Sequence, residues 1–126
     1  MAQSEFILVH IMFGFSAILP AFIMQFIDTE EPNKVMGYRT KWSMKSKETW
    51  KFAQKYSSKM MWWSTLVTIT VQLFSIFMLE NETSIIVAVG ALTLSISVAI
   101  GATERQLRLR FNKDGSPKSA EEEDLF

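Results

Sequence analysis

The most distinctive pattern along the chain is a set of three apolar stretches that contain no Asp, Glu, Lys or Arg. They cover residues 6–27, 61–79 and 84–102. As α-helices with a rise of about 1.5 Å per residue, they would extend about 33, 28 and 28 Å, close to the thickness of a bilayer hydrocarbon core. Helices buried in a soluble bundle normally keep charged residues on the side that faces water. The pattern therefore predicts an all-α fold, an integral membrane three-helix bundle.

The charged residues between these stretches predict how the spans are oriented. Eight Lys or Arg residues lie in the loop of residues 28–60, and three Arg residues follow the third span closely. The short segments 1–5 and 80–83 contain neither Lys nor Arg. Because basic loops favour the cytoplasmic side, we expect a multi-pass protein with its N-terminus outside and its C-terminus in the cytoplasm.

Two further boundaries follow from composition. Residues 1–112 are expected to form one three-span membrane domain. Residues 113–126 form a polar and finally acidic tail that is too poor in apolar residues to offset the entropy of ordering, so this tail is predicted to be disordered.

A second helical pattern begins inside the loop, with Ser46 as the predicted N-cap. Four lysines then recur at every fourth position, which places them in one stripe along the helix. We expect an amphipathic helix before the second span that lies at the membrane surface, with its lysines on lipid headgroups. The alternative is a helix surrounded by water, whose lysines reflect only the general excess of basic residues on the cytoplasmic side of a membrane. The lysines are Lys47, Lys51, Lys55 and Lys59.

Polar residues also recur within the second span. Ser64, Thr68, Gln72 and Ser75 share one helical face, and His10 in the first span is the only histidine of the chain. This face is expected to point inward, away from lipid. It has two interpretations: polar contacts that hold the helices together, or a small polar cavity or peptide groove.

Composition excludes several classes of function. The chain has 126 residues, 13 basic and 13 acidic side chains, and no cysteine. The balanced charge argues against a nucleic-acid partner, and the absence of cysteine excludes thiol chemistry and disulfides. We find no metalloprotease, nucleophile-elbow or phosphate-loop motif and no pair of intramembrane carboxylates, so neither an enzyme nor a cofactor or metal site is indicated.

The loop carries the most specific motif. Pro32-Asn33 is followed by Gly37-Tyr38-Arg39-Thr40 and then by Trp50, and Glu104 follows the third span. On these residues the chain resembles the SdpI/YfhL family of bacterial integral membrane proteins, in a minimal three-span form. The resemblance covers the chain from about the first span to Phe111. The motif residues taken as candidate site positions are Asn33, Gly37, Tyr38, Arg39, Thr40, Trp50 and Glu104.

The resemblance implies a non-catalytic immunity protein of the bacterial cell membrane. Such a protein protects against a secreted peptide toxin and signals by holding a cytoplasmic regulator at the membrane. The partners that the resemblance implies are the toxin and the regulator, and we also expect contact with the lipid bilayer and with further copies of the chain. The alternative is a subunit of an oligomeric small transporter or channel. Within the motif, Arg39 and Glu104 are candidates for an ion pair that locks the loop to the bundle, or these residues hold the fold without any partner.

Overall fold

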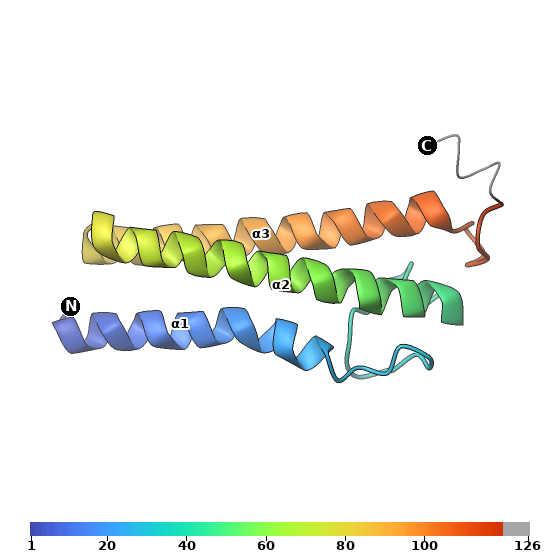
Figure 1. Cartoon of the computed structure of the whole chain (residues 1–126), viewed down its shortest axis with the longest axis horizontal. Coiled ribbons are helices and arrows are strands. Elements are labelled where there is room, and N and C mark those ends of the chain that lie inside the picture. Colours follow the sequence, from blue (N-terminus) through green and yellow to red (C-terminus); the bar gives the residue numbers. More distant parts are fainter. Residues whose placement is uncertain (120–126) are drawn as a thin grey trace.

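A computed structural model describes residues 1–119 and contains three helices, joined by one long loop and one tight turn. The helices are α1 (Gln3–Met24), α2 (Lys47–Met78) and α3 (Asn81–Arg110). α2 and α3 run antiparallel, and α1 packs beside them (Figure 1). The N-terminus and the α2–α3 turn lie at one end of the bundle, termed the turn end. The loop of residues 25–46 and the segment after α3 lie at the opposite end, termed the loop end.

All three helices are long and apolar enough to cross a membrane, which confirms the predicted membrane bundle. The chain is a multi-pass membrane protein. The helices differ from the predicted spans at their ends, because charge-free stretches mark the part of a helix that suits lipid and not the whole helix. α1 ends at Met24, where residues 25–27 leave the helix, whereas α3 continues through its basic residues to Arg110.

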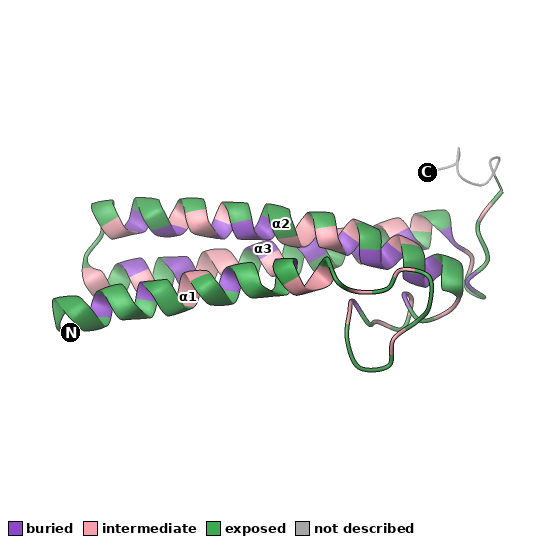
Figure 2. Ribbon diagram, turned by 60° about the horizontal axis from the view of Figure 1, so that its bottom comes forward, coloured by how far each residue is buried: buried purple, intermediate pink, exposed green. Residues whose placement is uncertain are grey.

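Within the apolar stretches, most large apolar side chains lie on the outside of the bundle, whereas small side chains fill much of its interior. Phe15, Phe77 and Leu94 are 64%, 83% and 70% exposed, whereas Ala21 and Ala99 are almost fully buried. Figure 2 shows the buried positions along the inner faces of the helices and exposed positions around the outside. Because lipid tails are as apolar as leucine, helices in a membrane associate through close backbone approach and polar contacts. This distribution therefore suits a lipid environment.

α2 is one continuous helix of 32 residues. Ser46 is its N-cap as predicted, because its hydroxyl oxygen accepts from the Thr49 N–H at 3.1 Å while the Thr49 hydroxyl oxygen accepts from the Ser46 N–H at 2.9 Å. The lysine-bearing segment is thus collinear with the second span, and Lys47 lies about 21 Å along the axis from Met61. The expectation that this segment lies flat on the membrane surface is wrong, because no bend separates it from the span.

The chain after α3 folds back onto the start of α2. Ser46 donates its hydroxyl to the Gly115 carbonyl at 2.7 Å, and Phe111 is buried in a cluster at the loop end. Residues 113–119 were predicted to belong to a disordered tail, and the structure instead gives them a defined turn. Composition missed this because one buried aromatic ring and a few backbone contacts anchor the turn. The remainder of the predicted tail, 120–126, lies outside the described residues.

Candidate functional site

The predicted intramembrane polar residues meet in the bundle interior near the turn end. Gln72 donates its side-chain amide to His10 Nδ1 at 3.0 Å and to the His10 carbonyl at 2.7 Å. Since Nδ1 accepts, His10 Nε2 carries the proton and donates to the Ser84 hydroxyl at 3.0 Å. Ser75 donates to the Gln72 carbonyl at 2.9 Å. One network therefore joins all three helices here.

A second polar group lies nearer the middle of the bundle. The hydroxyls of Ser64 and Ser95 are 2.7 Å apart, the Thr68 hydroxyl lies 3.2 Å from that of Ser95, and Thr65 donates to the Ala17 carbonyl at 2.8 Å. Within residues 1–119, no buried side-chain nitrogen or oxygen lacks a hydrogen-bond partner. The polar face points inward as expected. Because its groups already bond to one another, the geometry favours helix packing over a polar cavity.

The motif residues gather at the loop end, beginning with a turn at Asn33. The Asn33 Oδ1 accepts from the backbone N–H groups of Val35 at 2.8 Å and Met36 at 3.1 Å. Gly37 follows with φ of 107°, a conformation that residues with a Cβ rarely adopt. A Cβ at Gly37 would also lie only 2.8 Å from Gln54 Oε1. Glycine therefore lets the loop approach α2 closely.

Gln54 holds the loop against α2 with two hydrogen bonds. Its Oε1 accepts from the Tyr38 N–H at 2.8 Å, and its Nε2 donates to the Tyr38 carbonyl at 2.8 Å. One turn earlier, Trp50 Nε1 donates to the Asp28 carbonyl at 2.8 Å. Gln54 was not among the candidate site residues. The available signal was an amide next to Ala53, on the apolar side of an otherwise lysine-rich helix.

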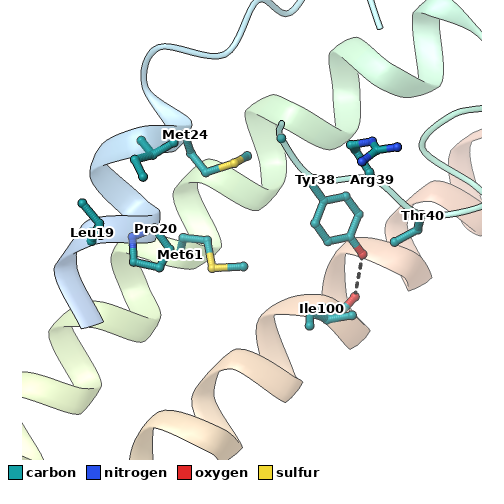
Figure 3. Close-up of a pocket in the computed structure, with 10 residues that line it drawn as sticks. Leu19, Pro20, Met24, Tyr38, Arg39, Thr40, Met61 and Ile100 are labelled. Carbon is teal, nitrogen blue, oxygen red and sulfur yellow. Dashed lines mark hydrogen bonds between the residues drawn. The ribbon is translucent and has the colours of Figure 1, made fainter. Parts of the chain in front are cut away.

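Glu104 joins the loop to α3. Its Oε1 accepts from the Tyr38 hydroxyl at 2.7 Å and from the Thr40 hydroxyl at 2.6 Å. The Tyr38 oxygen also lies 3.4 Å from the Ile100 carbonyl (Figure 3). Burial raises the pKa of the Tyr38 phenol, and the hydrogen bond to Glu104 raises it further. Ser43 completes the turn by accepting from the Thr40 N–H at 2.7 Å.

Arg39 does not take part in this network. Its side chain is exposed, and no ion pair joins it to Glu104 or to any other residue that the structure describes. The proposed Arg39–Glu104 pair is therefore wrong. Gln54 fixes the backbone of Tyr38, and the hydroxyls of Tyr38 and Thr40 occupy the Glu104 carboxylate in place of Arg39.

A comparison with known protein families identifies the family of this chain. The family model described as the SdpI/YfhL protein family matches residues 30–101 of the 126. The chain belongs to the SdpI/YfhL family. The match contains the loop motif and Trp50, and it ends three residues before Glu104. No curated protein and no solved structure matches the chain.

The four lysines of this SdpI/YfhL protein are all exposed on the outer side of α2. The Nζ atoms of Lys47 and Lys51 lie 2.9 Å from carboxylate oxygens of Glu31 and Glu30, respectively. Exposed pairs of this kind add little stability, so they orient the loop without fixing it. Contact between the lysines and lipid headgroups stays a prediction. Lys59 is best placed for it, because it is two residues before the apolar stretch.

The side chains of the motif bond mainly to one another and to the loop backbone. No group of His, Asp and Glu residues suited to a metal ion occurs within residues 1–119. The motif hydroxyls and the Glu104 carboxylate bond to each other and to the loop backbone. What this family member presents to its surroundings is a fixed loop with one exposed guanidinium group at Arg39.

Proposed function

We propose that this SdpI/YfhL protein is a non-catalytic immunity protein of a bacterial cell membrane that protects against a secreted peptide toxin. In this proposal the turn end faces outward and the loop end faces the cytoplasm, as the basic loop residues indicate. Family membership supports the general role. The observation that carries the proposal is a difference within the motif. The other motif residues build the fixed loop, termed the platform, whereas the Arg39 side chain is exposed on it.

The platform suits recognition because its shape is set before any partner arrives. Gln54 bonds both backbone groups of Tyr38, and Thr40 donates its N–H to Ser43 and its hydroxyl to Glu104, so the chain is held on both sides of Arg39. The nearby side chains of Val35 and Met36 are 81% and 46% exposed, so the loop presents a cation beside apolar surface. Ordering a loop in advance lowers the entropy cost of binding. We propose that a cytoplasmic regulator docks here.

Survival of toxin-sensitive bacteria tests the protective role. Cells expressing the chain or an empty vector are challenged with a secreted amphipathic peptide toxin. We expect the chain to raise survival, and Arg39→Gln to reduce that gain. Lys41→Gln removes an exposed charge two positions away in the same loop and should keep the gain. Both variants should have the same melting temperature in detergent as the wild-type protein, because Arg39 has no internal partner to lose.

Absence of protection by wild-type protein that reaches the membrane would contradict the immunity role. Equal protection by Arg39→Gln and wild type would contradict the role of Arg39. The same purified protein, reconstituted in liposomes, is measured for ion and solute flux. Flux without protection would favour an oligomeric transporter or channel subunit instead.

A further inference from the structure

A cleft of about 480 Å³ opens at the loop end, between the last turns of α1, the start of the apolar part of α2, and α3. The loop forms its remaining wall, with Tyr38 reaching across to α3 (Figure 3). At the turn end, α1 contacts α3 directly through His10 and Ser84. At the loop end, Tyr38 of the loop bonds to Glu104 of α3 instead, and the cleft lies between α1 and α3 there. Its apolar walls are formed by Leu19, Pro20, Ile23, Met24, Met61 and Ile100.

The position of the cleft places it at the boundary between hydrocarbon and headgroups. Met61 is the first residue of one charge-free stretch, and Ile100 is near the end of another. Trp62 and Trp63 follow directly, and tryptophan is enriched at this depth. Leu19 and Ile100 are 39% and 41% exposed on the outside of the bundle, so the cleft is open to the surrounding lipid.

Arg39 lines the polar end of this cleft. Its guanidinium has no hydrogen-bond or ion-pair partner among residues 1–119, so it is available to an external anion. A guanidinium group binds a phosphate through two parallel hydrogen bonds, and it does so more strongly away from bulk water. Apolar walls with a cation at their edge match an amphiphile that has an acyl chain and an anionic head.

The backbone around the cleft favours a lipid over a peptide. Gln54 already bonds both the N–H and the carbonyl of Tyr38, and Ser43 accepts from the Thr40 N–H. An extended peptide in the cleft would bring amide groups that these atoms cannot satisfy, and burying unpaired amides is unfavourable. An acyl chain brings no such groups.

We propose that this cleft binds one anionic phospholipid from the leaflet at the loop end, with an acyl chain against Leu19 and Met61 and the phosphate on Arg39. This proposal shares Arg39 with the regulator contact proposed above, but it does not depend on that contact, because lipid retention is measured on purified protein without toxin or regulator.

Native mass spectrometry of the full-length protein in detergent tests the site. The protein is mixed with equal amounts of phosphatidylglycerol and phosphatidylcholine that have the same acyl chains. We expect one retained phosphatidylglycerol per chain, preferred over phosphatidylcholine. Arg39→Gln should lower this preference about tenfold or more, because it removes a charge-assisted contact. Lys41→Gln, with the same loss of charge in the same loop, should keep the preference.

A second pair of variants tests the apolar walls. Leu19→Trp should narrow the cleft and reduce retention of both lipids, whereas Leu66→Trp, on an exposed face of α2, should not. Melting temperatures without added lipid verify that each variant is folded. Excess inorganic phosphate should leave the retained lipid in place, which distinguishes a lipid site from a free-anion site.

Several results would overturn the proposal. These are equal preference in Arg39→Gln and wild type, equal losses in Arg39→Gln and Lys41→Gln, or unchanged retention in Leu19→Trp. Displacement of the lipid by inorganic phosphate would assign Arg39 to a free-anion site. Retention of an added amphipathic peptide in place of the lipid would assign the cleft to peptide binding.

Discussion

Replacement of Gln54 by leucine removes the contact that fixes the motif loop. Leucine fills a similar volume but cannot bond the Tyr38 N–H and carbonyl, which Gln54 holds at 2.8 Å each. Both backbone groups are buried, and each unpaired buried group costs about 1–3 kcal/mol. We therefore expect Gln54→Leu to lower the free energy of unfolding by about 2–6 kcal/mol.

The assay is unfolding of purified protein in mixed micelles of a mild and a denaturing detergent, followed by tryptophan fluorescence. Gln106→Leu is the matched control, because the Gln106 side chain accepts an exposed hydrogen bond from Arg110 Nε at 3.2 Å. This control should change stability by less than about 0.5 kcal/mol. Gln54→Glu is a second probe, since it keeps an acceptor for the Tyr38 N–H but places an oxygen against the Tyr38 carbonyl. We expect it to be destabilised as well.

The argument for the clamp would be refuted if Gln54→Leu unfolded at the same detergent ratio as Gln106→Leu. It would also be refuted if Gln54→Glu were as stable as the wild-type protein. Either result would mean that the loop is held by its other contacts and that the amide is incidental.

Two further predictions concern neighbouring positions. Gly37→Ala should destabilise the protein by about 1–3 kcal/mol, because alanine is strained at this φ and its Cβ would press on Gln54. Gly101→Ala is the control, because its Cβ would meet nothing within 4 Å. In the same unfolding assay it should be neutral or slightly stabilising. Because the folded state raises the pKa of Tyr38, its stabilising contribution is complete below the ordinary value of about 10, begins to fall above it, and is lost completely only when pH passes the raised pKa of the folded state. The melting temperature of wild type should therefore exceed that of Tyr38→Phe at pH 8, and this advantage should be smaller at pH 11; a constant advantage would contradict the role of the phenol.

The fold could be predicted well from the sequence, because the composition of a segment alone indicates whether it can span a membrane. Charge-free stretches long enough to cross a bilayer leave few alternatives, and the spacing of Ser64, Thr68, Gln72 and Ser75 correctly placed one face of α2 inside the bundle. The Ser46 cap was also predictable, since its signal lies within a few residues of the helix start.

The site was less predictable, because it depends on contacts between segments far apart in the chain. Charge alone paired Arg39 with Glu104, but the carboxylate instead accepts from the hydroxyls of Tyr38 and Thr40. Which side chain of a loop points inward is decided by the backbone, and here Gln54 sets that backbone from α2. No local pattern gives this contact, since it spans 16 residues of sequence.

Single-cysteine labelling in intact bacteria tests most directly the claim that the chain crosses the membrane three times with its motif loop inside. The chain has no cysteine of its own, so each introduced thiol reports one position. With a membrane-impermeant maleimide, Glu82→Cys at the turn end should be labelled in intact cells. Lys41→Cys at the loop end should be labelled only after permeabilisation. Labelling of Lys41→Cys in intact cells, with Glu82→Cys protected, would contradict the proposed orientation, and labelling of both would contradict the membrane-spanning bundle.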